Sequence, residues 1–293
     1  MAGSAGIFLV AAGSPLAAGT DSLSYPLSIA RREIMSSKAA ARGAATSLAA
    51  VSKQSSKRSS PAASGGSATS KKQKTTPAKC ESNAPWYTFF TKGDEDYDRY
   101  MSTEWGFEKR SDRDLFEKLS LEGAQAGLSW KTILTKREAY RQTFHNFDVD
   151  KCAKMKNSDI TKILGIEGSD PDVVVRHKGK IESVINNAKM IQTMRKGELQ
   201  ESGQSFGEFL WSFVDNKPIL NSWKALSDMP SKTDESESMS KALRKRGFRF
   251  VGPTTCYSMM QACGLVIDHP VGTKEWIEAK RILEKRSGGY QSR

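Results

Sequence analysis

The hydrophobic positions from Trp86 onward recur every three or four residues, and no segment alternates apolar and polar residues over the length of a strand. Spacing of this kind is typical of helices that bury one face. The pattern therefore predicts an all-α domain over residues 81–275, followed by a C-terminal helix and tail over 276–293.

The first informative helix is expected at 111–127, with the sequence SDRDLFEKLSLEGAQAG. Ser111 is placed to cap its start, Asp114 completes a variant of the capping box, and Gly127 suits its C-terminal end. The helical spacing puts an acidic residue, Glu122, on the apolar face. That face comprises Leu115, Phe116, Leu119, Glu122 and Ala126.

A second helix is predicted to start directly afterwards, with Ser129 as its N-cap. Its inner side is formed by Trp130, Ile133, Leu134, Tyr140 and Phe144. A tight turn between the two helices would bring Glu122 and Trp130 into one pocket. Helix position alone leaves two interpretations of Glu122 open, a functional carboxylate and a carboxylate paired with a neighbouring Lys or Arg.

Two further helices, at 179–194 and 205–214, are assigned to the core and given no chemistry. Ser205 and Glu208 form a capping box at the start of the second one. The residues expected to face inward are Ile181, Val184, Ile185, Ala188 and Ile191, then Phe206, Phe209, Leu210 and Phe213.

Residues 240–264 (SKALRKRGFRFVGPTTCYSMMQACG) predict two short helices joined by a glycine-bounded loop. The first ends at Arg246 before Gly247, and Pro253 fits the first turn of the second, after Gly252. Unpaired backbone amides and the helix dipole at that start form an anion site suited to a phosphate. A surface helix pair with a solvated run of charge is the alternative, and the residues alone leave both open.

Charge is distributed unevenly along the chain. Residues 1–80 hold eleven Lys and Arg against two acidic residues, which is nine of the formal net charge of +12. They contain almost no aromatic residues and cannot bury enough apolar surface to offset the entropy of ordering. They are therefore predicted to form a disordered basic N-terminal tail, and any DNA surface on the folded part must come from local clusters of charge.

Within this tail, Lys57-Arg58 and Lys71-Lys72-Gln73-Lys74 form two basic clusters separated by 12 residues. The pattern resembles a bipartite nuclear-localisation signal, so a nuclear import receptor is an expected partner and the nucleus the expected compartment. The Arg-, Ser- and Ala-rich, acid-poor stretch before it favours a mitochondrial transit peptide as the alternative. A basic linker that attracts DNA without specificity is the third interpretation.

The four cysteines, Cys80, Cys152, Cys256 and Cys263, show neither paired zinc spacing nor a disulfide framework. Cys256 and Cys263 lie in a helical, apolar stretch and are predicted to be buried free thiols, which indicates a reducing compartment. No apolar run approaches the roughly 20 residues that a membrane span needs. We therefore expect no association with a membrane.

With these segments together, the chain from about Trp86 to Gly272 resembles the DNA-3-methyladenine glycosylase I family, a member of the helix–hairpin–helix DNA glycosylase superfamily. The segments that carry the resemblance are YMSTEWG, LEGAQAGLSW, KREAYRQTFHNFD, VRHKGKIESVINNAK, WSFV and KALRKRGFRFVGPTTCYSMMQACGLVIDH. The resemblance implies an all-α, helix–hairpin–helix DNA glycosylase-like domain. Its hairpin would grip the DNA backbone, and its base pocket would lie between helical layers.

The resemblance also implies roles for individual residues of the pocket. Glu122 corresponds to the pocket glutamate, Trp130 to the aromatic that stacks on the extruded base, and Tyr100 to a pocket tyrosine. Tyr97 and Trp86 fall where the family places further pocket aromatics.

Two segments are expected to contact DNA. Gly127-Leu128-Ser129 matches the turn that enters the gap left by the flipped nucleotide. The expected contacts from the hairpin are Arg246, Gly247, Arg249, Gly252 and Thr254.

One departure from the family concerns metal. Its zinc-containing bacterial members use two Cys and two His, whereas Met101 and Thr273 occupy two of those positions here and only His269 remains. Because four ligands hold a structural zinc, we predict no metal. Trp276 and Ile277 in the helix at 274–286 are the expected apolar replacement.

The expected function is a monofunctional DNA N-glycosylase that flips out and excises 3-methyladenine from alkylated double-stranded DNA, which initiates base excision repair. A catalytically silent helix–hairpin–helix DNA-binding module is the alternative. We expect a monomer without a cofactor. No lysine is placed as an obvious nucleophile, so the base should leave without strand cleavage, and Asp268 ranks below Glu122 as a catalytic carboxylate.

Overall fold

The structure, a computed structural model, describes residues 85–166, 172–286 and 288–293, so the predicted tail over 1–80 lies outside the described residues. The α-helices are α2 (Thr88–Thr91), α3 (Glu95–Thr103), α4 (Asp112–Ala124), α5 (Trp130–Thr135), α6 (Arg137–Thr143), α7 (Val149–Lys154), α8 (Asn157–Leu164), α9 (Lys178–Lys196), α10 (Glu198–Ser202), α11 (Phe206–Trp211), α12 (Asp234–Lys245), α13 (Pro253–Ala262) and α14 (Lys274–Glu284). Short 3₁₀ helices are η1 (His145–Phe147), η2 (Ser212–Val214) and η3 (Leu226–Asp228), and the strands are β1 (Ile219–Leu220), β2 (Val266–Ile267) and β3 (Gln291–Ser292). The mainly helical architecture is the one that the hydrophobic spacing predicts.

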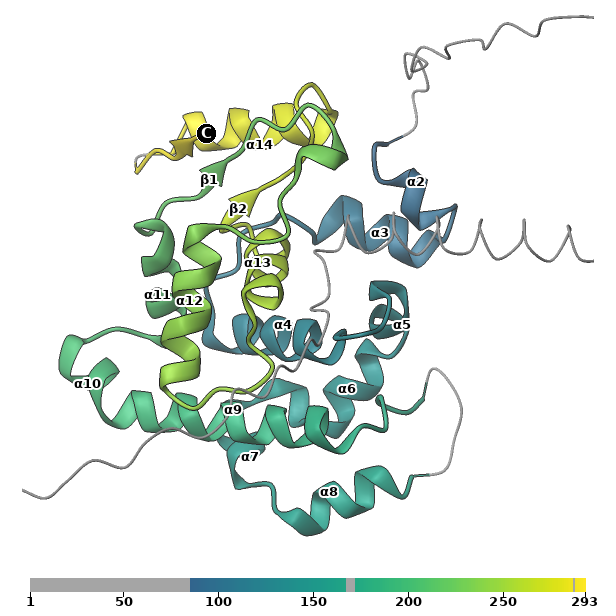
Figure 1. The fold of residues 1–293 in the computed structure, drawn as a ribbon, viewed down its shortest axis with the longest axis vertical. Coiled ribbons are helices and arrows are strands. Elements are labelled where there is room, and N and C mark those ends of the chain that lie inside the picture. Colours follow the sequence, from purple (N-terminus) through teal and green to yellow (C-terminus); the bar gives the residue numbers. More distant parts are fainter. Residues whose placement is uncertain (1–84, 167–171, 287) are drawn as a thin grey trace, which may run out of the picture.

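The core lies around α4, which is enclosed by α13 on one side and α9 on the other (Figure 1). Leu115, Phe116 and Leu119 of α4 are buried, as predicted. Each large apolar side chain buried in this way contributes about 1.5–3 kcal/mol to stability. The predicted stripe of α9, from Ile181 to Ile191, is buried as well. In 205–214, Phe206 and Leu210 are buried, whereas Phe209 and Phe213 are only half-buried at the edge of the core.

The predicted helix starts agree with the structure. The side-chain oxygens of Ser111, Ser129 and Ser205 accept hydrogen bonds from the backbone N–H three residues later, and Glu208 completes the capping box with Ser205. Pro253 occupies the first turn of α13 behind Gly252. Local capping chemistry therefore locates these starts to the residue.

Two helix ends differ from the prediction. α4 ends at Ala124, three residues before Gly127, because the chain turns at Gln125 to reach Ser129. The single helix expected from Trp130 to Phe144 is broken at Lys136, which has φ −90° and ψ 0° and separates α5 from α6. The buried Lys136 ammonium donates to the Val173 carbonyl at 2.7 Å, a tertiary contact that periodicity does not reveal.

A small parallel sheet was not predicted. β1 lies between β2 and β3, and each strand is two residues long, too short for an alternating pattern to show in the sequence. α14 packs over this sheet, where Trp276 lies against a cluster of Leu220, Ile267 and Leu283. Trp276 thus packs as predicted, but the prediction for Ile277 was wrong, since 55% of it is exposed.

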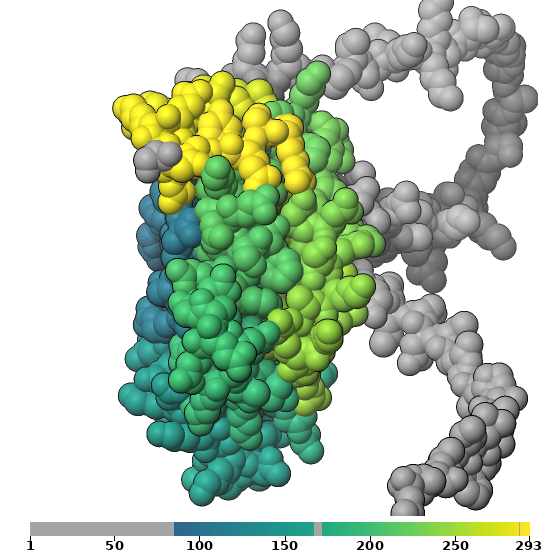
Figure 2. Space-filling model, turned by 90° about the vertical axis from the view of Figure 1, so that its left-hand side faces the viewer, coloured from purple at the N-terminus to yellow at the C-terminus, as the bar shows by residue number. Residues whose placement is uncertain are grey.

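The C-terminal segment covers one end of the molecule, and the segment around α8 forms the opposite end (Figure 2). Over residues 85–166, 172–286 and 288–293, no helix is long and apolar enough to cross a membrane. Cys152, Cys256 and Cys263 are buried free thiols. Burial raises the pKa of Cys256 and Cys263 to about 12, so both stay protonated at neutral pH.

Candidate functional site

Glu122 lies on the inner face of α4, with 2% of the residue exposed. The turn that follows brings it to Trp130 through Gln125, which is also buried. In the amide orientation that satisfies both of its ends, Gln125 donates to Glu122 Oε2 at 3.0 Å and accepts from the Trp130 backbone N–H at 3.2 Å. The predicted meeting of Glu122 and Trp130 is therefore present, and Gln125 is one residue that sequence reasoning missed.

Two aromatic side chains complete this cluster. The rings of Tyr100 and Trp130 are 5.2 Å apart at an interplanar angle of 41°, and Tyr97 lies 6.4 Å from Tyr100. Tyr97 and Tyr100 both come from α3, whose N-cap Asp94 accepts from the Tyr97 backbone N–H. Asp94 also forms an ion pair with Lys131 at 2.5 Å, which ties the start of α3 to the start of α5.

Lys118 is a second charged residue of the cluster that the sequence analysis did not single out. Its ammonium donates to the Tyr100 hydroxyl at 3.0 Å and lies 4.6 Å from the Trp130 ring centroid, with 4% of the residue exposed. Burial lowers the pKa of this ammonium, and the charge of Glu122 acts in the opposite direction. The signal was available, because residues four apart lie on one helix face.

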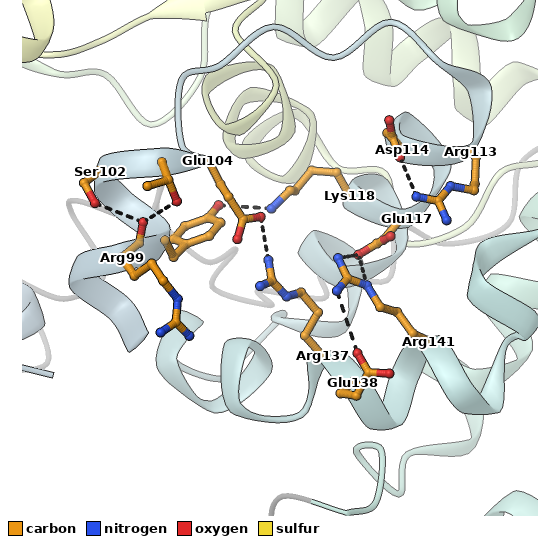
Figure 3. A network of polar contacts seen from close by, with 12 residues as sticks. Arg99, Ser102, Glu104, Arg113, Asp114, Glu117, Lys118, Arg137, Glu138 and Arg141 are labelled. Carbon is orange, nitrogen blue, oxygen red and sulfur yellow. Dashed lines mark hydrogen bonds and ion pairs between the residues drawn. The ribbon is translucent and has the colours of Figure 1, made fainter. Parts of the chain in front are cut away.

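The next ion pair outward is Glu104 with Arg137, at 2.6 Å (Figure 3). Burial raises the pKa of the Glu104 carboxyl, but the hydrogen bond and charge of Arg137 outweigh it and leave the pKa below its usual value. In Figure 3, Lys118 is directed to the Tyr100 hydroxyl, whereas Glu117, its neighbour on α4, points to Arg141. Each of these two glutamates thus has an arginine as its partner.

Trp86 lies away from Glu122. Its ring contacts are with Tyr87, Phe90, Trp105 and His269, at centroid distances of 5.6–5.8 Å. Phe90 then contacts Tyr97 at 6.1 Å, so Trp86 reaches the pocket only through intervening rings. The structure therefore places Trp86 at the outer end of an aromatic chain rather than beside Trp130.

The residues at the family's zinc positions do not fit a metal. Met101 is buried in the core and Thr273 serves as the N-cap of α14, while His269 is buried between Trp86 and Trp105. Burial lowers the pKa of His269 to about 4, which keeps the ring neutral. Within the described ranges no group of three His, Cys, Asp or Glu could hold an ion. The edge-to-face contact of Trp86 with His269 joins the segments before α2 and after β2.

Asp268 is a structural carboxylate in this fold. It is completely buried and accepts four hydrogen bonds, which come from Asn221, Trp223, Tyr257 and Gln261 at 2.6–2.8 Å. These donors link β1, β2 and α13, and they use both carboxylate oxygens. The ranking of Glu122 above Asp268 as a catalytic carboxylate stays a prediction.

The turn Gly127-Leu128-Ser129 lies at the surface beside the pocket. Gly127 is exposed and has φ +77°, a backbone conformation that other residues adopt at a cost, and Leu128 packs partly against the core. Lys180 Nζ donates to the Ala126 carbonyl at 2.6 Å, which anchors the turn to α9.

The hairpin between α12 and α13 is fixed to α9 by two asparagines. Asn187 donates to the Arg249 carbonyl at 2.9 Å and accepts from its N–H at 2.8 Å, and Asn186 donates to the Gly247 carbonyl at 2.8 Å. Phe250, with φ +57°, packs against Gly123. A Cβ atom added at Gly123 would lie only 3.1 Å from the Cβ atom of Phe250. The hairpin and the turn at Gly127 therefore border the same end of α4.

The two arginines expected to bind DNA differ in their surroundings. Arg246 is held by Glu198 through two hydrogen bonds of 2.5 and 2.6 Å and lies over the Phe209 ring. Arg249 has a side chain that is 48% exposed and lies 3.4 Å from Glu182. Arg249 is thus the more available cation.

The start of α13 has the features of an anion site. Gly252 offers no side chain to cap the helix, unlike Ser111 or Ser129, so the first amides are left for another partner. Thr254 is half-buried in this first turn. Arg244, with Lys241, lines a surface hollow next to Pro253.

Comparisons with known proteins identify the family. The sequence profile of the methyladenine glycosylase family matches residues 90–275. DNA-3-methyladenine glycosylase 1 of Escherichia coli is 46% identical over 176 residues, which cover 60% of this chain and 89% of that protein. The DNA-3-methyladenine glycosylase of Haemophilus influenzae is 47% identical over 173 residues, which cover 59% of this chain and 88% of that protein.

Solved structures give the same result. A crystal structure of 3-methyladenine DNA glycosylase I superimposes with a TM-score of 0.57 at 45% identity, over 62% of this chain and 94% of that one. A structure of the Staphylococcus aureus 3-methyladenine DNA glycosylase I, which concerns recognition of 3-methyladenine, superimposes with a TM-score of 0.57 at 34% identity. The match covers 62% of this chain and 92% of that one. The matched region contains the pocket and the hairpin, and the chain therefore belongs to the methyladenine glycosylase family.

Proposed function

We propose that this protein is a 3-methyladenine DNA glycosylase I that excises 3-methyladenine from alkylated DNA. The observation that carries the proposal is the buried carboxylate of Glu122, joined through Gln125 to Trp130, with the Tyr100 ring 5.2 Å from that of Trp130. An acid and two aromatic side chains in one buried cluster suit a flat, positively charged base. Membership of the family supports the same substrate.

The base must leave the duplex before it can be read. In DNA, 3-methyladenine carries a delocalised positive charge that weakens its glycosidic bond. Glu122 accepts a hydrogen bond from the exocyclic amine, and the Trp130 face attracts the cation by about 1–2 kcal/mol once water is excluded. Because an undamaged adenine is neutral and more firmly bonded, positioning and charge suffice to select the lesion.

DNA binding is assigned to two segments that border the pocket. The turn Gly127-Leu128-Ser129 fills the gap that the extruded nucleotide leaves, and the start of α13 with Arg249 contacts phosphates. Asn187 and Phe250 hold the hairpin against α9 and α4, so a duplex bound there lies over the entrance to the site.

The direct test is base release. The purified full chain is incubated with double-stranded DNA methylated in vitro, and the released bases are identified by chromatography and mass spectrometry. We expect 3-methyladenine as the main product. DNA binding without any released base would instead support the alternative, a catalytically silent DNA-binding module.

We infer further that the enzyme is monofunctional. Lys118 is the lysine that the structure adds to the pocket; 4% of the residue is exposed, and its ammonium donates to the Tyr100 hydroxyl. It is therefore not presented as a nucleophile to the sugar. Borohydride should trap no covalent DNA adduct, and the product strand should stay intact until it is treated with alkali. A trapped adduct that is lost in Lys118→Met would contradict this inference.

We propose that the protein acts in the nucleus. The support is the pair of basic clusters at Lys57-Arg58 and Lys71-Lys72-Gln73-Lys74, which lie outside the described residues. Residues 50–80 fused to a fluorescent protein should accumulate in nuclei, and replacement of Lys71, Lys72 and Lys74 by Ala should abolish this. A mitochondrial signal from residues 1–80 would support the alternative compartment.

A further inference from the structure

Lys118 has no part in the function proposed above, yet it lies at the centre of the site. It is on the inner face of α4, one turn before Glu122, and 4% of the residue is exposed. Its Nζ is 3.0 Å from the Tyr100 hydroxyl oxygen, 4.7 Å from the centroid of the Tyr100 ring and 4.6 Å from that of the Trp130 ring. The ammonium therefore lies against the two aromatic side chains that are assigned to the base.

This position matters because ring faces attract cations. A lysine over the Tyr100 and Trp130 rings gains the same electrostatic attraction that a cationic base would gain by stacking there. A cationic base entering the site thus meets a cation that is already present. An uncharged base entering it leaves the lysine attracted to Glu122 and does not bring two positive charges together.

The surrounding charges lead to the same conclusion. Glu122 acts on Lys118 through its charge, and the next pair, Glu104 with Arg137, is internally balanced at 2.6 Å. Tyr100 and Cys263, the other titratable groups that face Lys118, are kept neutral by burial, which raises the pKa of both. A pocket with Glu122 alone would be net negative, whereas Lys118 brings the sum to neutral.

We propose that Lys118 is a specificity-determining residue that weakens the preference of this pocket for cationic bases and admits uncharged purine lesions. The proposal rests on the proposed glycosylase function and names a second class of substrate for the same site. Hypoxanthine in DNA is the probe of this class, because it carries a carbonyl oxygen where adenine has its amine. The Lys118 ammonium and the Tyr100 hydroxyl are both able to donate to such an oxygen.

The chemistry of the two classes differs at the leaving group. When the C1′–N9 bond of deoxyinosine breaks, its electron pair stays on the base, which leaves with a negative charge that a nearby ammonium stabilises. Water adds its oxygen to C1′ and releases one proton, and the departing base takes up one proton to become neutral hypoxanthine. A cationic 3-methyladenine leaves as a neutral base without this help.

The test compares excision from two duplexes by the full chain under single-turnover conditions. One duplex contains a single deoxyinosine and the other is randomly methylated DNA, from which 3-methyladenine is quantified. The variants are Lys118→Met, which keeps an unbranched chain without the charge, and Lys118→Arg, which keeps the charge. Lys136→Met is the control, since it removes another buried ammonium that donates to the Val173 carbonyl instead. Melting temperatures verify that each variant is folded.

Wild type should release both bases. Lys118→Met should lower the ratio of hypoxanthine excision to 3-methyladenine excision at least tenfold, and Lys136→Met should keep the wild-type ratio. Release of 3-methyladenine but no hypoxanthine by the wild type would overturn this inference and leave the proposed function standing. An unchanged ratio in Lys118→Met would do the same. Wild type that releases neither base would overturn the proposed function itself.

Discussion

At the scale of single residues, buried carboxylates in this protein have opposite uses. Asp268 accepts four hydrogen bonds from protein donors, so its charge is satisfied inside the fold. Glu122 is placed between a helix face, the Gln125 amide and an aromatic pair. The surroundings of Asp268 indicate a structural role, and those of Glu122 are consistent with its proposed role in binding the base.

Replacement of Glu122 by Gln should keep the fold and remove the negative charge that attracts the cationic base. We expect 3-methyladenine excision to fall at least about tenfold, which corresponds to about 1.4 kcal/mol in the transition state. Glu117→Gln is the matched control, because Glu117 lies on the same helix but pairs with Arg141. An excision rate in Glu122→Gln equal to that of wild type would show that the carboxylate has no role.

Replacement of Asp268 by Asn should affect stability rather than chemistry. The change removes the negative charge and places an NH₂ group next to hydrogen-bond donors. The free energy of unfolding should therefore fall by about 2–4 kcal/mol. Chemical denaturation measures this loss directly. Below the melting temperature, the excision rate should stay within a few-fold of wild type, and a selective loss of catalysis in a stable variant would instead make Asp268 a catalytic residue.

At the scale of elements, the starts of helices were predictable from the sequence and their ends were less so. Ser111, Ser129 and Ser205 cap their helices through contacts three residues away. The break at Lys136 and the strand pairing of β1 depend on partners far along the chain, which a local pattern does not contain. Lys118 could have been predicted as a pocket residue from its spacing to Glu122, whereas the bridge made by Gln125 required the geometry of the turn.

The hairpin gives a prediction that separates its two arginines. Arg249→Ala should weaken binding to any duplex and lower the slope of log K against log salt by about one, because one fewer counterion is released. Arg246→Ala should mainly reduce the melting temperature, since Arg246 is paired with Glu198 and packed on Phe209. Binding titrations at several salt concentrations distinguish the two outcomes, and an unchanged slope for Arg249→Ala would remove it from the DNA surface.

At the scale of the whole molecule, both ends of the catalytic region are held by packing. Trp86 lies on His269 near the start of the described chain, and β3 pairs with β1 near residue 293. α14 covers this sheet through Trp276, whose indole N–H donates to the Asn221 carbonyl at 2.9 Å. Aromatic contacts and a short parallel sheet thus hold both ends of this region.

A protein clamped in this way should not depend on zinc. Overnight treatment with a chelator should leave the melting temperature and the excision rate unchanged, and elemental analysis should find less than one zinc per chain. A stoichiometric zinc ion would mean that other residues bind it together with His269, in place of the ligands missing at Met101 and Thr273. Cys80, which lies outside the described residues, is one such candidate.

The tail should be dispensable for catalysis. A protein that begins at residue 81 should melt within about 2 °C of the full chain, because the tail composition cannot form a core. Its excision rate at saturating DNA should be equal to that of the full chain, while its affinity at low salt should be lower through the loss of positive charge. Unfolding of the shortened protein would assign residues 1–80 to the fold.

The placement of both pocket charges on α4, one turn apart, has an evolutionary consequence. Each lysine codon, AAA or AAG, differs by a single nucleotide from a glutamine codon, so one point mutation can remove the charge at position 118 and leave Glu122 in place. Neither the backbone nor the hairpin has to change for this step. A lineage that carries this domain can therefore widen or narrow its repertoire of repaired lesions without rebuilding its grip on DNA.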